Sequence, residues 1–186
     1  QVFFYCKRLL HSWLLNLLKL KLIIILNRTG DYLVKRDNVR ICVPRFLQIG
    51  KGSLKELPGI IKTIGSISSL LIVTDKQMVE FGYVKKLQDI LISAGLKSDV
   101  FDNTVPDPTD KVVLEGVKFL EKYKNDAVIG FGGGSPIDTA KAISAMAKFS
   151  KNIQDYKPPS LFNKNGLPII AIPTTAGTGS EVTHHS

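Results

Sequence analysis

Three short segments of this chain are apolar at almost every position, and they constrain its fold more than any other feature of the sequence. Strands with one face in water alternate apolar and polar residues, whereas strands covered by helices on both faces do not. We therefore predict that these segments are central strands of a parallel sheet. They cover residues 69–73, 127–131 and 167–172; a further strand is predicted at 97–101, and an edge strand, interrupted by Pro44, within 39–50.

Between these strands, apolar residues recur at intervals of three and four, as they do in a helix that buries one face. The pattern covers residues 78–94, 113–123 and 137–147, and Gly95 is in position to end the first helix. Strands that alternate with helices of this length are joined by right-handed crossovers. The sequence thus predicts an α/β fold with a doubly wound, mostly parallel, Rossmann-like sheet flanked by helices, in one domain covering residues 38–186.

Residues 1–37 are apolar and basic, and we expect them to lie outside this fold. Four Lys and Arg residues interrupt the apolar sequence at 3–26, whereas a membrane-spanning helix needs about 20 consecutive apolar residues. We therefore expect no membrane span; an amphipathic helix that anchors the protein at a membrane surface is the alternative. The chain begins at Gln1 and its first methionine is Met78, which favours a fragment or a translation that continues from upstream.

Charge and cysteine content limit the class of protein and its compartment. Residues 1–50 carry nine Lys and Arg against two Asp and Glu, whereas residues 51–186 carry sixteen against fourteen. The predicted domain therefore has no basic run of the kind that binds nucleic acid. The two cysteines, Cys6 and Cys42, have no C-x-x-C spacing, so we expect a reduced, cytoplasmic protein.

Ligands of open α/β sheets bind beyond the carboxyl ends of the strands, and a glycine-rich sequence at residues 130–138 leaves one predicted strand and enters a helix. We expect Ser135 to cap this helix, with Pro136 in its first position and Asp138 in its third. Three consecutive glycines let an anion approach the backbone, and the free amides of a helix start favour a phosphate or diphosphate. A tight turn with an ordinary cap is the alternative.

Two further strand ends carry residues suited to the same ligand. Asp75 follows the first buried strand, where a carboxylate accepts hydrogen bonds from adenosine ribose hydroxyls and repels a 2′-phosphate; a helix N-cap is its alternative role. The loop after the last strand contains Thr174, Thr175 and Thr178, whose hydroxyls could donate to a diphosphate; a flexible connection is the alternative. Two such loops at neighbouring strand ends favour one shared ligand.

Two long motifs resemble the iron-containing (group III) alcohol dehydrogenase family. They are GGGSPIDTAK at residues 132–141 and PIIAIPTTAGTGSEVT at residues 168–183. VTDK at 73–76 and VPDPT at 105–109 are similar to the same family, so the resemblance covers residues 40–183. It implies a two-domain enzyme, in which an N-terminal α/β domain binds NAD(P). A C-terminal helical domain, which we expect to be absent from this chain, holds iron or zinc through one Asp and three His.

Carried over by position, the resemblance also gives candidate cofactor residues. It implies that Asp75 binds the adenosine ribose and that the chain prefers NAD to NADP. Asp107 stands where the family has Asn and is assigned to the adenosine. The diphosphate loop, and then the residues near the phosphates and the nicotinamide, are Gly133, Gly134, Ser135 and Asp138, followed by Thr174, Thr175 and Thr178.

The reaction implied by the resemblance is hydride transfer between a small alcohol or aldehyde and the nicotinamide, in a homo-oligomer, with Fe²⁺ or Zn²⁺ of the complete enzyme as Lewis acid. It assigns no catalytic residue and no metal ligand to this chain, and the adjacent His184 and His185 stand where the family has no ligands. We therefore expect the 186-residue chain alone to have no turnover. A glycerol dehydrogenase-like enzyme and a non-catalytic nucleotide-binding module are the alternatives.

Overall fold

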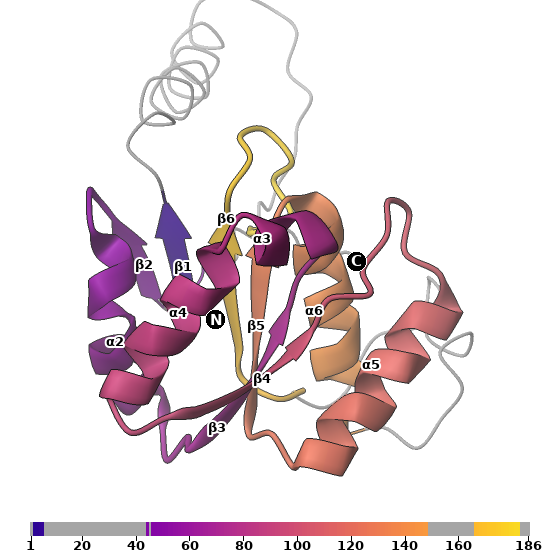
Figure 1. Cartoon of the computed structure of the whole chain (residues 1–186), viewed down its shortest axis with the longest axis horizontal. Coiled ribbons are helices and arrows are strands. Elements are labelled where there is room, and N and C mark those ends of the chain that lie inside the picture. The colour runs from indigo at the N-terminus through magenta and orange to yellow at the C-terminus, as the bar shows by residue number, and fades with distance from the viewer. Residues whose placement is uncertain (1, 6–43, 45, 149–165, 183–186) are drawn as a thin grey trace, which may run out of the picture.

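The computed structural model describes residues 2–5, 44, 46–148 and 166–182. Within them, six strands form one sheet in the order β2-β1-β6-β5-β3-β4, and all neighbouring strands run parallel (Figure 1). The strands are β1 (Val2–Tyr5), β2 (Phe46–Ile49), β3 (Ser69–Val73), β4 (Lys97–Phe101), β5 (Ala127–Gly132) and β6 (Ile169–Pro173). The four strands predicted after residue 50 are confirmed, and β2 is the predicted edge strand.

Helices cover both faces of this sheet, as the doubly wound fold requires. They are the 3-10 helix η2 (Ser53–Glu56) and the α-helices α2 (Leu57–Ile64), α3 (Lys76–Glu80), α4 (Tyr83–Ser93), α5 (Asp110–Tyr123) and α6 (Gly134–Met146). One face packs against α2, α3 and α4, and the other packs against α5 and α6 (Figure 1). The predicted α/β fold class is therefore confirmed.

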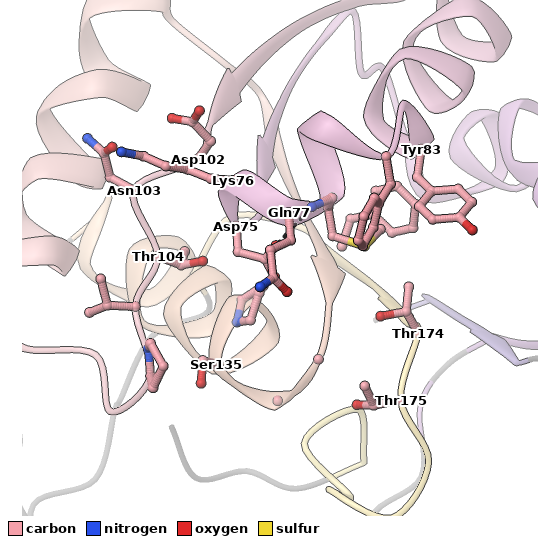
Figure 2. Close-up of a pocket in the computed structure, with 18 residues that line it drawn as sticks. Asp75, Lys76, Gln77, Tyr83, Asp102, Asn103, Thr104, Ser135, Thr174 and Thr175 are labelled. Carbon is pink, nitrogen blue, oxygen red and sulfur yellow. Dashed lines mark hydrogen bonds between the residues drawn. The ribbon is translucent and has the colours of Figure 1, made fainter.

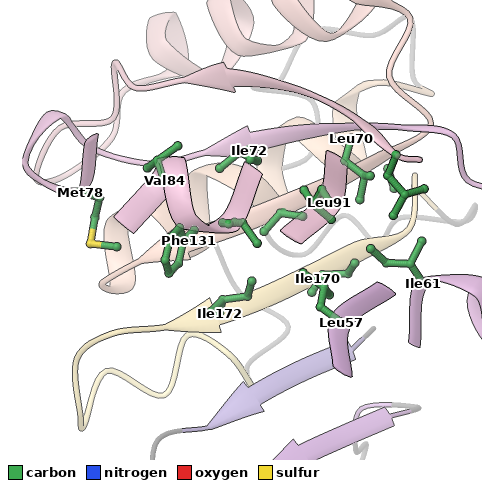
Figure 3. Close-up of a cluster of buried hydrophobic side chains, with 14 residues drawn as sticks. Leu57, Ile61, Leu70, Ile72, Met78, Val84, Leu91, Phe131, Ile170 and Ile172 are labelled. Carbon is green, nitrogen blue, oxygen red and sulfur yellow. The ribbon is translucent and has the colours of Figure 1, made fainter. Parts of the chain in front are cut away.

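Strand β3 shows why its sequence does not alternate between apolar and polar residues. Leu70 and Ile72 belong to the core under α2, α3 and α4 (Figure 3), whereas Leu71 and Val73 belong to the core under α5 and α6. Successive side chains of a strand point to opposite faces, and here both faces are dry. All five residues of β3 are buried as a result.

The helix predicted over residues 78–94 is two helices, because the chain turns at Gly82. This glycine lies between α3 and α4 with a φ of 73°, a left-handed conformation that glycine adopts without a steric penalty. The turn leaves the Phe81 side chain 66% exposed, although the periodicity placed it on the buried face. Gly95 has a φ of 77° and follows the last turn of α4, as predicted.

Part of the N-terminal segment lies inside the sheet. Val2–Tyr5 pairs with β2 on one side and with β6 on the other, so the expectation that residues 1–37 lie outside the fold is wrong for these four residues. Residues 6–37 lie outside the described part of the chain. Among the described residues, no helix combines the length and apolar character needed to cross a membrane.

Candidate cofactor site

The carboxyl ends of four neighbouring strands, β6, β5, β3 and β4, are tied together by hydrogen bonds from threonines. The buried hydroxyl of Thr74 donates to the Phe131 carbonyl at 2.8 Å, and the buried hydroxyl of Thr104 donates to the Thr74 carbonyl at 2.6 Å. The Thr174 amide donates to the Gly132 carbonyl at 2.8 Å. These bonds cross from strand to strand, so they fix the loops that follow the strands relative to one another.

These loops surround a pocket of about 970 Å³ (Figure 2), which is large enough for a cofactor. Six of the nine predicted cofactor residues line it. They are Asp75, Gly133, Gly134, Ser135, Thr174 and Thr175. The three others, Asp107, Asp138 and Thr178, are not among the lining residues. The structure thus brings the predicted strand ends to one pocket, but three of the nine predicted residues do not line it.

The glycine turn opens α6 earlier than the sequence suggested. The N-cap is Gly133 and the helix begins at Gly134, so the prediction that Ser135 is the N-cap is wrong. Small residues are required here because strand and helix nearly touch: a Cβ on Gly130 would lie 3.0 Å from the Ile137 Cα. The amides of Gly134 and Ser135 lie in the first helical turn, where an amide has no partner within the helix. The turn therefore presents donors at the positive end of a helix.

Asp75 has the N-cap role that was the alternative considered for it in the sequence, and it also lies at the pocket. It is the N-cap of α3, and its Oδ1 accepts a hydrogen bond of 2.9 Å from the Met78 amide. Its Oδ2 lies 3.4 Å from where a Cβ on Gly132 would stand, so this second oxygen is directed towards the glycine turn. Asp75 lines the pocket as well. The hydrogen bond to the Met78 amide holds the Asp75 carboxylate in one orientation. Its other oxygen can therefore accept a hydrogen bond from a ligand.

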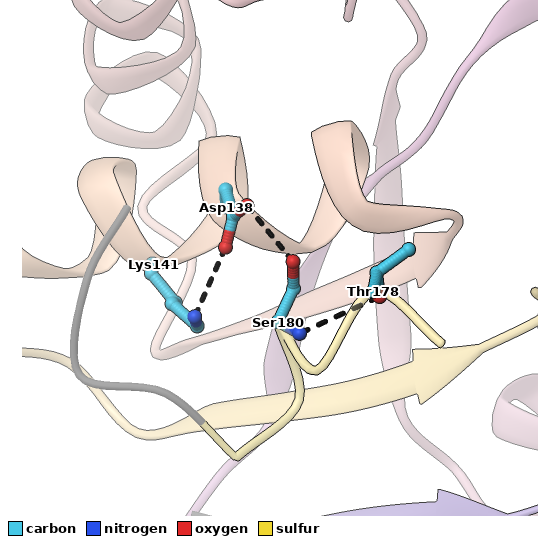
Figure 4. A network of polar contacts seen from close by, with 4 residues as sticks. All are labelled: Asp138, Lys141, Thr178 and Ser180. Atoms are coloured by element: carbon cyan, nitrogen blue, oxygen red, sulfur yellow. Dashed lines mark hydrogen bonds and ion pairs between the residues drawn. The ribbon is translucent and has the colours of Figure 1, made fainter. Parts of the chain in front are cut away.

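Asp138 and Thr178 hold the second loop against α6 rather than lining the pocket. Asp138 Oδ2 accepts a bond of 2.9 Å from the Ser180 hydroxyl, and its Oδ1 pairs with Lys141 at 3.0 Å (Figure 4). The Thr178 hydroxyl accepts from the Ser180 amide at 3.4 Å. Thr178 also packs at the start of α6, with its Cβ 3.3 Å from where a Cβ on Gly134 would stand. These contacts fasten the loop that carries Thr174.

Asp107 is exposed, with a φ of 53°, and it follows the lining residue Pro106 without lining the pocket itself. The sequence reasoning also missed pocket residues in three places: beyond strand β4, in α3 and at its junction with α4, and beside the glycine turn at Phe131 and Pro136. They are Lys76, Gln77, Met78, Phe81, Tyr83, Asp102, Asn103, Thr104, Val105, Pro106, Phe131 and Pro136. The first group had a signal, because the strand at 97–101 was predicted and its carboxyl end could have been searched for ligands.

Comparison with known proteins identifies the family. The sequence profile described as iron-containing alcohol dehydrogenase matches residues 44–186. This chain belongs to that family. The resemblance read from the two long motifs is thereby confirmed.

Relatives of the chain include dehydrogenases and reductases. NAD-dependent methanol dehydrogenase of Bacillus methanolicus is 40% identical over 141 residues, which are 76% of this chain and 37% of the relative. Lactaldehyde reductase of Escherichia coli (strain K12) is 41% identical over 136 residues, 72% of this chain and 35% of the relative. The crystal structure of sulfoacetaldehyde reductase from Bifidobacterium kashiwanohense in complex with NAD+ superposes with a TM-score of 0.70 and 33% identity, covering 78% of this chain and 38% of that one.

The chain therefore spans little more than a third of the length of these relatives. No group of three or more His, Cys, Asp or Glu residues in the described part of the chain is arranged to hold a metal ion. His184 and His185 lie outside the described residues.

Proposed function

We propose that this chain is the cofactor-binding half of an NAD-dependent alcohol dehydrogenase. The observation that carries the proposal is the arrangement of helix-start amides and the Asp75 carboxylate in one pocket along four neighbouring strand ends. Neighbouring strands are spaced about 4.8 Å apart, so four strand ends extend over roughly 14 Å. This length suits an elongated dinucleotide rather than a single phosphate.

Each part of the dinucleotide has a place along this edge of the sheet. The diphosphate binds at Gly133, Gly134 and Ser135, where free amides and the helix dipole favour an anion. Asp75 Oδ2 accepts from the adenosine ribose hydroxyls and repels the 2′-phosphate of NADP. Because Asp75 ends β3 and the glycine turn ends β5, the nicotinamide half continues to β6, at Thr174 and Thr175.

Bound NAD supplies the hydride acceptor, and the residues of this chain bind and orient it. The iron of the family's name does not fit the described residues, which contain no metal-ligating group. We therefore assign the Fe²⁺ or Zn²⁺ of the complete enzyme to residues outside the described part. We further infer a small alcohol or aldehyde substrate, a cytoplasmic location and a homo-oligomeric complete enzyme, as the family resemblance implies.

Isothermal titration of the 186-residue chain with NAD and with NADP tests the cofactor assignment. We expect NAD to bind and NADP to bind at least tenfold more weakly, because two like charges close together in a partly buried site repel strongly. Absence of NAD binding, or equal affinity for both, would contradict the assignment. We also expect no alcohol-dependent NADH formation by this chain alone, and measurable oxidation of ethanol or propanediol would refute that part.

A further inference from the structure

Two aromatic side chains at the junction of α3 and α4 are exposed and line the pocket. Phe81 is 66% exposed and Tyr83 is 47% exposed. Their rings meet edge to face, with centroids 6.3 Å apart and an interplanar angle of 80°. Exposed aromatic rings lose the stabilisation that burial would give them, and both of these are among the pocket-lining residues. Their exposure at a pocket wall indicates that they contact a ligand.

The side chains on either side of this junction pack in the buried cluster that joins α2, α3 and α4 to β3, β5 and β6. Met78 and Val84, on either side of the junction, share one buried cluster with Phe131 of β5 and Ile172 of β6 (Figure 3). The left-handed turn at Gly82 begins α4 immediately after Phe81. Phe81 and Tyr83 thus lie close in the chain to side chains that are buried against the sheet, so the core fixes the position of the junction.

The pocket therefore has two chemically different ends. Tyr83 and Thr174 lie at one end in Figure 2, and Lys76 and Asn103 lie at the other. The backbones of Asn103 and Asp75 form an isolated antiparallel β-bridge. This second end of the pocket therefore adjoins Asp75, whose carboxylate we assign to the adenosine ribose. The aromatic end is the opposite one, across the glycine turn.

We propose that Phe81 and Tyr83 form the wall that contacts the nicotinamide ring of the dinucleotide. This inference rests on the proposed function, because the polarity of the dinucleotide follows from Asp75. A planar heteroaromatic ring packs well against the face or edge of another ring. Thr174 and Thr175 line the same pocket, so aromatic surface contacts the nicotinamide ring and hydroxyls bind its polar edge.

A comparison of NADH with ADP-ribose tests this placement, because ADP-ribose keeps the adenosine and the diphosphate but lacks the nicotinamide. The dissociation constants of both ligands are measured for the full chain and for the Phe81→Ala and Tyr83→Ala variants. We expect each substitution to weaken NADH binding about fivefold to tenfold and to leave the affinity for ADP-ribose unchanged. Tyr83→Phe, which keeps the ring, should retain most of the affinity for NADH.

Tyr123→Ala is the matched control, because Tyr123 is 42% exposed on α5 and does not line the pocket. Equal weakening of NADH and ADP-ribose would overturn the proposal and place the rings at the adenosine end. Unchanged affinity for both ligands would also overturn it. If Phe81→Ala or Tyr83→Ala fails to fold, Phe81→Leu and Tyr83→Leu decide by the same criterion. Failure of the unmodified chain to bind either ligand would instead defeat the proposed function.

Discussion

Ser180 Oγ donates a hydrogen bond of 2.9 Å to Asp138 Oδ2, and this bond joins the loop after β6 to α6 (Figure 4). The two residues are far apart in the sequence, and neither lines the pocket. Their contact nevertheless positions the loop that carries Thr174 and Thr175. Asp138 therefore supports the loop beside the pocket rather than lining the pocket itself.

Ser180→Ala should weaken NAD binding and lower the free energy of unfolding by about 1–2 kcal/mol, because a hydrogen bond to a carboxylate is lost. Urea unfolding and calorimetric titration measure the two effects. Ser93→Ala is the control, since the Ser93 hydroxyl bonds only to the Ile90 carbonyl on the exposed side of α4. If Ser180→Ala and Ser93→Ala bind NAD equally well, the loop does not depend on this bond.

Asp75→Asn should raise the affinity for NADP relative to NAD by about tenfold or more, because the substitution removes the charge that repels a 2′-phosphate. Asparagine also caps helices, so the bond to the Met78 amide is retained and α3 should be preserved. Titration with both cofactors measures the ratio. Asp89→Asn removes an exposed charge that pairs with Lys85 on α4 and should leave the ratio unchanged. An unaltered ratio in Asp75→Asn would remove Asp75 from the ribose site.

Gly116→Ala should destabilise the chain by about 1–3 kcal/mol, because the added methyl overpacks the contact between α5 and α6. A Cβ at Gly116 would lie 2.2 Å from Ile143 Cδ1. Ile143→Val removes that methyl group and should recover part of the loss in the double variant, which thermal or urea unfolding can measure.

Gly59→Ala is the matched control for Gly116→Ala, because Gly59 lies in α2 and a Cβ there would meet nothing within 4 Å. In an open helical position, alanine stabilises a helix by about 0.5–1 kcal/mol relative to glycine. The two substitutions should therefore have opposite signs. A stabilising Gly116→Ala would mean that α5 and α6 do not approach this closely.

Asp126 makes the stability depend on pH at the opposite end of the sheet. The Ser68 amide and hydroxyl and the Ser69 amide donate to Asp126 Oδ2 at 2.8, 2.7 and 3.0 Å. The hydrogen bonds from Ser68 hold the pKa of Asp126 below its ordinary value of 3.8, with that from Ser69 acting in the same direction. A lowered pKa adds stability above the unfolded value, and this stability is lost as the pH falls through the folded pKa.

Asp126→Asn should therefore lower the free energy of unfolding near pH 7 and have a smaller effect below pH 3.8, the ordinary value for this carboxyl. Urea unfolding at both pH values measures the change. Asp89→Asn is again the control, because its exposed partner Lys85 provides one surface ion pair, which contributes little. An Asp126→Asn effect that is independent of pH would contradict the role of the charge.

Much of the site could be predicted because each strand end is marked locally. The glycines at 132–134 directly follow an apolar run, and Asp75 and Thr174 each stand one residue beyond one. Parallel strands bring their carboxyl ends to one edge. Asp138 was predicted in the diphosphate loop, but its side chain faces Ser180 and Lys141. A helical side chain points according to its position in the turn, and α6 starts at Gly134 rather than after Ser135.

The sequence by itself determined the layered α/β fold, because a strand that is buried on both faces has an unbroken run of apolar residues. Only the tertiary structure decided which helix faces meet and which side chains reach the pocket. Gly116 needs no side chain because Ile143 of another helix fills the space, and Phe81 is exposed because Gly82 turns the chain beside it. Such contacts join segments distant in sequence or depend on a single backbone angle, so no local periodicity encodes them.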